Sequence, residues 1–377
     1  MQEIFKIKFK DKKTKARIGL LKTRKGTIET PFFMPVASKG GVKHFSSKDL
    51  EEIGIDAVIS NTLLLHLKPG EKVIKKLGGI GKFMNFRGIN VTDSGGFQMY
   101  SDRIYISSND EGVLFRNPFT SEKIFITPEK DMEIQVDIGA DIIMCLDSMP
   151  LLENSKKEIG EAVRKTTSWA KRCKEHHDKI QKNIPKEKRQ ILFGICQGGI
   201  HKDLREKSAK EMLKVNFEGY SIGGLALGET HEQEIEAIKI QKEIIPQNKP
   251  VYLMGAGHPY EVLDAISLGI DMFDSRYPTQ NARRGTIFTW SGKLRIFRGR
   301  YKEDKNPIDK KCKCFACKNY SRAYIRHLLL QEEGLGYRIA SYHNLYFMHE
   351  LIEKAKDAIR NGKFSQLKEK VRKAYSN

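Results

Sequence analysis

The stretch ILFGICQGG (191–199) joins an unbroken apolar run to a polar, glycine-rich end. The same pattern recurs in seven other places: PFFMPVAS (31–38), DAVISNT (56–62), GINVTDSGG (88–96), ADIIMCLD (140–147), GYSIGGLALGE (219–229), PVYLMGAG (250–257) and GIDMFDS (269–275). Continuous apolar strands separated by helical stretches indicate a parallel sheet that is covered on both faces. Eight such units predict an α/β fold of the (β/α)8 TIM-barrel class. An open doubly wound sheet is the alternative. Such a sheet needs no particular number of strands, so a count of eight favours the barrel.

Functional side chains are expected where these runs end. Six residues stand at or just past the ends of runs: Asp93, Asp147, Gln197, Gly224, Met254 and Asp274. In a barrel those ends converge on one rim, which is where catalytic residues lie. Polar residues can also simply mark where strands stop, but that explanation accounts poorly for three carboxylates that each follow an apolar run.

Two regions break the strand–helix rhythm. Residues 101–127 alternate between strand-like segments and turn signals, which predicts an inserted antiparallel hairpin. From residue 294 to about 344 the alternation stops, and residues 345–377 read as a lysine-rich amphipathic helix. We therefore expect a catalytic barrel over 1–293, a zinc-binding subdomain over 294–344 and a C-terminal helix over 345–377 that packs back on the barrel.

A cysteine cluster, CKCFAC (312–317), lies in the second of these parts. Three thiolates and one imidazole make a closed tetrahedral zinc site with no open position, so the metal would be structural. The expected ligands are Cys312, Cys314, Cys317 and His343. Three free thiols or a redox pair are the alternatives. His327 and His349 are alternatives for the fourth ligand, because spacing alone does not exclude them.

The composition favours a polyanionic partner only modestly. The chain carries 67 Lys and Arg against 47 Asp and Glu, a net charge of +20, and such a field attracts nucleic acid. Lysine is spread along the whole chain, however, so a lysine-rich proteome explains part of the excess. No apolar run approaches the roughly 18 residues of a membrane span, and the N-terminus lacks the apolar core of a signal peptide. We expect a soluble cytoplasmic protein.

Several motifs occur together in one order. They are VTDSGGFQ (91–98), FGICQGG (193–199), IGGLALGE (222–229), YLMGAGHP (252–259), DMFDSRYPTQNARRG (271–285) and SRAYIRHL (321–328). Each is weak alone, but as an ordered set they resemble the bacterial-type tRNA-guanine transglycosylase family over nearly the whole chain. That resemblance implies exchange of guanine at the first anticodon position of tRNA for a 7-deazaguanine base, in queuosine biosynthesis.

The chemistry of base exchange explains why such a family needs carboxylates. Breaking an N-glycosidic bond at C1′ develops oxocarbenium character, which a carboxylate can capture as a covalent intermediate. The resemblance assigns that role to Asp274. A second acidic group must carry the proton of the leaving and incoming bases, and the resemblance places it at Asp93.

The resemblance also implies a base pocket. It assigns Asp147 to the guanine N–H donors, Gln197 and Gly224 to the carbonyl, and Phe97 and Met254 to the two ring faces. Each has a structural alternative: Phe97 as core, Met254 as a gap-filler and Asp147 as a helix cap.

Recognition of one base inside folded RNA requires that the base be extruded from its stack. Asn281, Arg283 and Arg284 follow Asp274 closely and are expected to hold flanking phosphates or bases. A solvated basic loop is the alternative.

Departures from the usual family pattern leave the incoming base open. Ser148 and Met149 replace an acidic residue and a cysteine, and Leu227 replaces a smaller or β-branched residue. The usual bacterial substrate is preQ1, with an aminomethyl arm; queuine, with a bulkier cyclopentenediol, is the alternative.

The resemblance implies a homodimer as well, with an interface that contains Phe83, Tyr320, Tyr324 and His327. The alternative for these four residues is packing around the zinc site.

Three other classes of function are possible. A non-catalytic tRNA-binding paralogue or partner subunit is disfavoured because Asp93 and Asp274 are both present. A metal-dependent hydrolase would need more histidine at the strand ends than His258. For a simple RNA-binding protein with no chemistry, carboxylates at the rim would be a liability next to phosphates.

Overall fold

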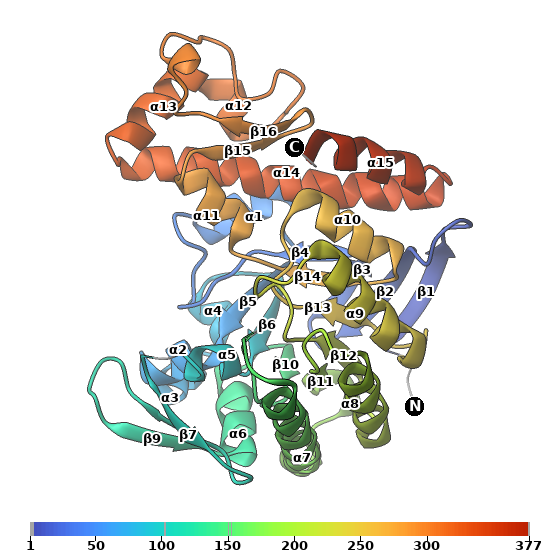
Figure 1. Ribbon diagram of the computed structural model, residues 1–377. Coiled ribbons are helices and arrows are strands. Elements are labelled where there is room, and N and C mark those ends of the chain that lie inside the picture. Colours follow the sequence, from blue (N-terminus) through green and yellow to red (C-terminus); the bar gives the residue numbers. More distant parts are fainter. Residues whose placement is uncertain (1–3, 102, 150, 152, 376–377) are drawn as a thin grey trace.

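The computed structural model describes residues 4–101, 103–149, 151 and 153–375, apart from the side chain of Phe97. Eight parallel strands form its centre (Figure 1): β4 (Phe32–Met34), β5 (Ala57–Asn61), β6 (Ile89–Asp93), β10 (Ile142–Met144), β11 (Ile191–Cys196), β12 (Gly219–Ile222), β13 (Val251–Leu253) and β14 (Met272–Asp274). Each lies within one of the eight quoted runs, so the strand prediction is confirmed.

The strands are paired in the order β4-β14-β13-β12-β11-β10-β6-β5. The ring is completed between its two ends, because the amide of Ala37 donates to the carbonyl of Ile59 at 2.7 Å and the amide of Ile59 donates to Pro35 at 3.2 Å. This closure confirms the barrel and excludes the open doubly wound sheet.

Helices connect the strands and surround the barrel. They are α1 (Ser47–Ile53), α2 (Thr62–Leu67), α3 (Glu71–Lys76), α4 (Ile80–Phe83), α5 (Gly96–Met99), α6 (Pro128–Ile138), α7 (Lys156–Ile180), α8 (Lys202–Val215), α9 (His231–Ile244), α10 (Pro259–Ser267) and α11 (Tyr277–Arg283), with a short 3-10 turn η1 (Lys186–Lys188). Local sequence sets several starts: Ser155 with Glu158 and Thr230 with Gln233 form reciprocal capping boxes on α7 and α9.

The insertion after β6 is an antiparallel sheet of three strands, β7 (Tyr105–Ser108), β8 (Val113–Arg116) and β9 (Lys123–Ile126). The predicted hairpin is therefore present, with one more strand than expected. A second antiparallel sheet, β1 (Phe5–Lys10), β2 (Arg17–Thr23) and β3 (Gly26–Thr30), precedes the barrel and was not anticipated. Its first strand, FKIKFK, alternates apolar and lysine residues, so period-two spacing could have found it.

The C-terminal region contains a hairpin, β15 (Thr286–Thr289) and β16 (Gly292–Arg295), the 3-10 turn η2 (Gly299–Tyr301), and helices α12 (Phe315–Asn319), α13 (Arg322–Leu330), α14 (Gly334–Arg360) and α15 (Phe364–Tyr375). In Figure 1, α14 runs along the barrel and supports both the cysteine-bearing segment and α15. The expected boundaries after residues 293 and 344 fall inside β16 and α14, and the division into three parts stays a prediction. No helix among the described residues has the length and apolarity to cross a membrane.

Candidate active site

One cavity of about 590 Å³ opens at the carboxyl ends of the barrel strands. Five of the residues singled out from the sequence line it: Asp93, Asp147, Gly224, Met254 and Asp274. They come from five different strands or the loops after them, so only closure of the barrel brings them together.

Asp274 ends strand β14, and one of its carboxylate oxygens is held from two sides. The hydroxyl of Tyr252 donates to Oδ1 at 2.5 Å, and the amide of Gly255 donates to the same atom at 2.9 Å. No hydrogen bond from the described residues reaches Oδ2. Burial raises the pKa of Asp274, while Tyr252, Gly255 and Arg276 act in the opposite direction. The arrangement orients the carboxylate and leaves one oxygen available to a substrate.

Asp93 ends strand β6 and lies in a cradle of donors. The amide of Asn61 reaches both carboxylate oxygens at 2.9 Å, and the backbone amides of Thr62 and Gly95 donate to Oδ1 at 3.2 and 3.0 Å. Burial nevertheless raises the pKa of Asp93 to about 7, and the nearby charge of Asp274 adds to the shift. A carboxyl group with such a pKa can give and take a proton at neutral pH.

Asp147 and Gln197 contact each other at the floor of the site. The side-chain amide of Gln197 donates to Oδ2 of Asp147 at 2.7 Å, and the hydroxyl of Ser94 donates to Oδ1 at 2.8 Å. The Gln197 side-chain oxygen is buried without a hydrogen-bond partner among the described residues. Burial raises the pKa of Asp147. A planar ligand with adjacent donors and acceptors would satisfy these groups.

Position 224 requires glycine both because of its backbone angle and because the Gln197 side chain lies so close to it. Its φ is +67°, and a Cβ atom there would lie 2.3 Å from the Gln197 side-chain oxygen. Arg205, fully buried, donates to the carbonyl oxygens of Gly223 and Gly224 at 2.8 and 3.1 Å and so supports this loop from behind. Met254 is partly exposed in the cavity. The side chain of Phe97 lies outside the described part of the chain, so the sandwich of the base stays a prediction.

The three residues expected to bind RNA lie on and just after α11. The amide of Asn281 donates to the carbonyl of Tyr277 at 2.9 Å, within its own helix. Arg283 is half-buried, and its Nη1 has no partner among the described residues. Burial, with Arg284 and Arg276 nearby, lowers the pKa of Arg283. Arg284 is exposed.

Three residues that the sequence did not single out, Lys43, His44 and Arg276, belong to the same basic patch. Arg283 and Lys43 both lower the pKa of His44, after the larger effect of burial, and Nε2 of His44 is buried without a partner among the described residues. We call Lys43, His44, Arg276, Arg283 and Arg284 the basic rim. None of the five forms an ion pair with a described carboxylate, so the basic rim could accept an anion.

Two further residues of the site, Asn61 and Tyr252, have sequence features that mark them as candidates. Asn61 pairs in register with Asp93 across β5 and β6, and it ends an apolar run just as Asp93 does. Tyr252 lies on β13 two residues before Met254, which directly follows the strand, and in extended backbone that spacing places side chains on the same face. Strand-end polarity and period-two spacing could therefore have found both Asn61 and Tyr252.

The cysteine cluster and His343 come together as a metal-binding group. Nδ1 of His343 lies 3.8, 3.5 and 3.3 Å from the sulfurs of Cys312, Cys314 and Cys317. Tetrahedral bonds of zinc length to sulfur and nitrogen imply edges of about 3.5 Å. Nε2 of His343 lies 2.7 Å from the carbonyl of Phe288, which leaves Nδ1 as the ligand atom. The four residues therefore fit a tetrahedral ion.

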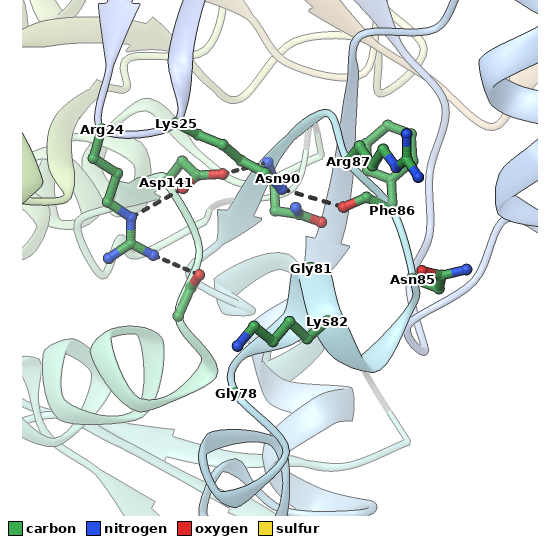
Figure 2. Close-up of a pocket in the computed structure, with 11 residues that line it drawn as sticks. Arg24, Lys25, Gly78, Gly81, Lys82, Asn85, Phe86, Arg87, Asn90 and Asp141 are labelled. Atoms are coloured by element: carbon green, nitrogen blue, oxygen red, sulfur yellow. Dashed lines mark hydrogen bonds and ion pairs between the residues drawn. The ribbon is translucent and has the colours of Figure 1, made fainter.

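A second hollow, of about 350 Å³, lies at the opposite end of the barrel (Figure 2). Arg24 donates to Asp141 at 2.9 Å and to the carbonyl of Gly139, and Lys25 donates to the carbonyls of Phe86 and Gly88. Arg24 and Lys25 are thus engaged by the protein, and no residue singled out from the sequence lines this hollow.

Comparison with known proteins agrees with the motifs. The family model for queuine tRNA-ribosyltransferase matches residues 11–377. The chain is 46% identical to the queuine tRNA-ribosyltransferase of Fusobacterium nucleatum over 370 residues, covering 98% of this chain and 97% of that protein. It is 44% identical to that of Lysinibacillus sphaericus over 364 residues (97% and 94%) and 40% identical to that of Halothermothrix orenii over 373 residues (99% and 98%). The chain therefore belongs to the queuine tRNA-ribosyltransferase family.

Proposed function

We propose that this protein is a tRNA-guanine transglycosylase, a pentosyltransferase that exchanges guanine at the first anticodon position for a 7-deazaguanine base. The observation that carries the proposal is the pair of carboxyl groups in one cavity. Oδ2 of Asp274 accepts no hydrogen bond from the described residues, while Asp93 has a pKa raised to about 7. Two acidic groups with separate environments suit a nucleophile and an acid–base group.

The reaction then follows in two displacements. Oδ2 of Asp274 forms a bond to C1′ of the ribose as the bond from C1′ to guanine breaks, and protonated Asp93 gives its proton to the departing base. In the second step Asp93 takes a proton from the incoming base, whose nitrogen attacks C1′ and releases the Asp274 carboxylate. One glycosidic bond replaces another, so the reaction needs no nucleoside triphosphate.

The floor of the cavity supports base recognition. A guanine edge offers two N–H donors and a carbonyl, and Asp147, Gln197 and Gly224 are the groups we assign to it. The present hydrogen bond from Gln197 to Asp147 satisfies part of the carboxylate; a bound base would compete with it. The resemblance implies preQ1 as the incoming base, with queuine as the alternative.

The basic rim supports binding of the RNA backbone. A half-buried guanidinium without an ionic partner gains a charge-assisted hydrogen bond when a phosphate arrives. Three members of the rim, Arg276, Arg283 and Arg284, follow Asp274 closely along the chain, so phosphates next to the reacting nucleotide are the ones it would hold. Arg283 is the residue we expect to contribute most, because it is the most desolvated of the three arginines.

We assign zinc to the Cys3His group, because thiolate-rich tetrahedral sites favour that ion.

A homodimer is proposed through the surface near Tyr320 and Tyr324. The rings of these two residues stack at 5.7 Å, and Tyr324 is exposed. A tRNA substrate implies work in the cytoplasm.

The test is displacement of radiolabelled guanine from a tRNA with G at the first anticodon position, with guanine, preQ1 and queuine as competing bases. Release of label by at least one of them supports the proposal. Absence of release by any of the three, including guanine itself, would show the chain to be a non-catalytic paralogue or partner subunit.

A further inference from the structure

The strands that lead to Asp93 and Asp147 are neighbours in the barrel, but their backbones pair only briefly. Strand β6 pairs with β5 through five positions, the last of which joins Asp93 to Asn61. On its other side β6 pairs with β10 at one position of the described chain, Val91 with Ile142. Beyond that position the two strands run toward the cavity that Asp93 and Asp147 line, and something other than a strand must satisfy their backbone groups.

The side-chain amide of Gln135, on helix α6, bonds to both strands at this place. Its Nε2 donates to the carbonyl of Met144 at 2.8 Å, and its Oε1 accepts from the amide of Met144 at 3.2 Å. The same Oε1 accepts from the hydroxyl of Thr92, the residue before Asp93, at 2.9 Å. One buried side chain therefore bonds β10 as a neighbouring strand would, and at the same time ties β10 to β6.

Asp131 fixes the direction of this amide. Its Oδ2 accepts from Nε2 of Gln135 at 2.8 Å, one helical turn away on α6. Asp131 is fully buried, and burial raises its pKa well above the ordinary value. The amide of Gln135 then uses both donor hydrogens and its acceptor oxygen, so it cannot turn over without losing hydrogen bonds.

The segment that follows β10 is held by side chains of α7. The amide of Leu146 donates to Sγ of Cys173 at 3.4 Å, and the amide of Ser148 donates to the hydroxyl of Thr166 at 2.9 Å. Asp147 lies between these two anchored amides. Its position in the cavity therefore depends on how helices hold the backbone around it.

Gln135 differs from the α7 side chains because it bonds both strands, one residue before Asp93 and three residues before Asp147. We propose that Gln135 is a positioning residue for base exchange, which sets the separation of Asp93 and Asp147 so that one guanine reaches both. This inference rests on the proposed function, in which Asp147 meets the N–H donors of the base and Asp93 moves its proton. A changed separation would misplace one of these groups, and a misplacement of about 1 Å can cost roughly a hundredfold in rate.

The test measures kcat per active site and the KM values for guanine and tRNA, in the exchange of labelled guanine into tRNA. Gln135→Met keeps the length of the side chain and removes its hydrogen bonds. We expect this variant to raise the KM for guanine by about tenfold and to lower kcat by about tenfold. The KM for tRNA should stay unchanged, because the basic rim is intact.

A second pair of variants removes and restores one bond of the same network. Thr92→Val keeps the shape of the side chain and removes the hydroxyl that donates to Gln135. It should change kcat and the KM for guanine in the same directions as Gln135→Met, by about threefold. Thr92→Ser keeps the hydroxyl and should behave as the wild type.

The matched control is Gln190→Met. The amide of Gln190 is also buried, and it donates to the backbone carbonyls of Gln135 and Ala140. Its loss loosens α6 and the start of β10 without removing the bonds of the Gln135 side chain. We expect the control to lower the melting temperature and to leave both KM values unchanged.

The inference is overturned if Gln135→Met and Thr92→Val keep the wild-type KM for guanine. It is also overturned if Gln190→Met raises that KM equally, because α6 would then only support the fold. Should Gln135→Met fail to fold, the comparison of Thr92→Val with Thr92→Ser decides in the same way. Absence of guanine exchange in the wild type would overturn the proposed function, and the inference with it.

Discussion

The hydroxyl of Tyr252 donates a hydrogen bond to Oδ1 of Asp274, from the neighbouring strand of the barrel. This bond favours the ionised carboxylate and lowers its pKa against the effect of burial. Tyr252 touches no reacting atom in the scheme above. It is therefore a positioning residue, which holds the nucleophile charged and correctly turned.

Tyr252→Phe should lower kcat by about tenfold, the value of one hydrogen bond to a charged group. Because the donor stabilises the charged form, its loss raises the pKa of Asp274, and the acid limb of the kcat/KM profile should move to higher pH. A pH series of guanine exchange measures this shift. An unchanged acid limb would assign Tyr252 a packing role only.

Asp274→Asn should reduce exchange by about 10³-fold or more, because the variant lacks the carboxylate that captures C1′. Binding of tRNA, measured by filter retention or anisotropy, should stay within about threefold of the wild-type value, since the basic rim is untouched. Asp56→Asn, at an exposed position before β5, is the matched control. Normal turnover in Asp274→Asn would show that the nucleophile lies elsewhere.

The raised pKa of Asp93 predicts how activity depends on pH. Guanine can depart with a proton only while Asp93 is protonated, so kcat/KM for tRNA should fall as pH rises above about 7. A profile that stays flat to pH 9 would contradict this assignment.

The same shift predicts a dependence of stability on pH. The folded chain keeps the Asp93 proton up to about pH 7, whereas the unfolded chain loses it near the ordinary value of 3.8. Asp93 therefore lowers the stability of the fold increasingly between these pH values. The gain in melting temperature from Asp93→Asn should be larger at pH 8 than at pH 4, as differential scanning calorimetry would show.

Cys314→Ser should remove the metal and loosen the segment from residue 312 to 343. Wild-type protein is expected to contain about one zinc per chain by elemental analysis, and the variant much less. Hydrogen exchange should rise in α12 and α13 but not in the barrel strands. Cys173→Ala, a buried thiol on α7 outside the cluster, should keep its metal. A metal-free variant with unchanged local protection would refute a structural role.

Arg283→Gln should weaken tRNA binding and reduce the slope of log K against log salt by about 1, because one phosphate contact is lost. Lys239→Ala, an exposed cation on α9, serves as the control and should leave the slope unchanged. Equal effects of the two substitutions would mean that the basic rim acts only through net charge.

Much of the fold could be predicted from local sequence. The apolar runs around residues 191–199 and 269–275 predicted strands because burial on both faces leaves a pattern that depends on neighbouring residues alone. The N-terminal strands β1 and β2 are not followed by helices, so they lie outside the strand–helix rhythm that marked the barrel. Their place against the barrel depends on distant contacts such as the buried ion pair of Arg17 with Asp271.

By itself the sequence determined the eight strand units, the three carboxylates at strand ends and the thiol ligands, since spacing along the chain decides each of these. Only the tertiary structure decided which groups share a site. In the structure, His343 lies with the three cysteines, whereas His327 and His349 do not. Asn61 lies beside Asp93, and Glu234, His258 and Glu261 line the same cavity as Asp93 and Asp274. The physical reason is that burial, charge repulsion and ligand distance depend on segments that are far apart in the chain and meet only when the barrel closes.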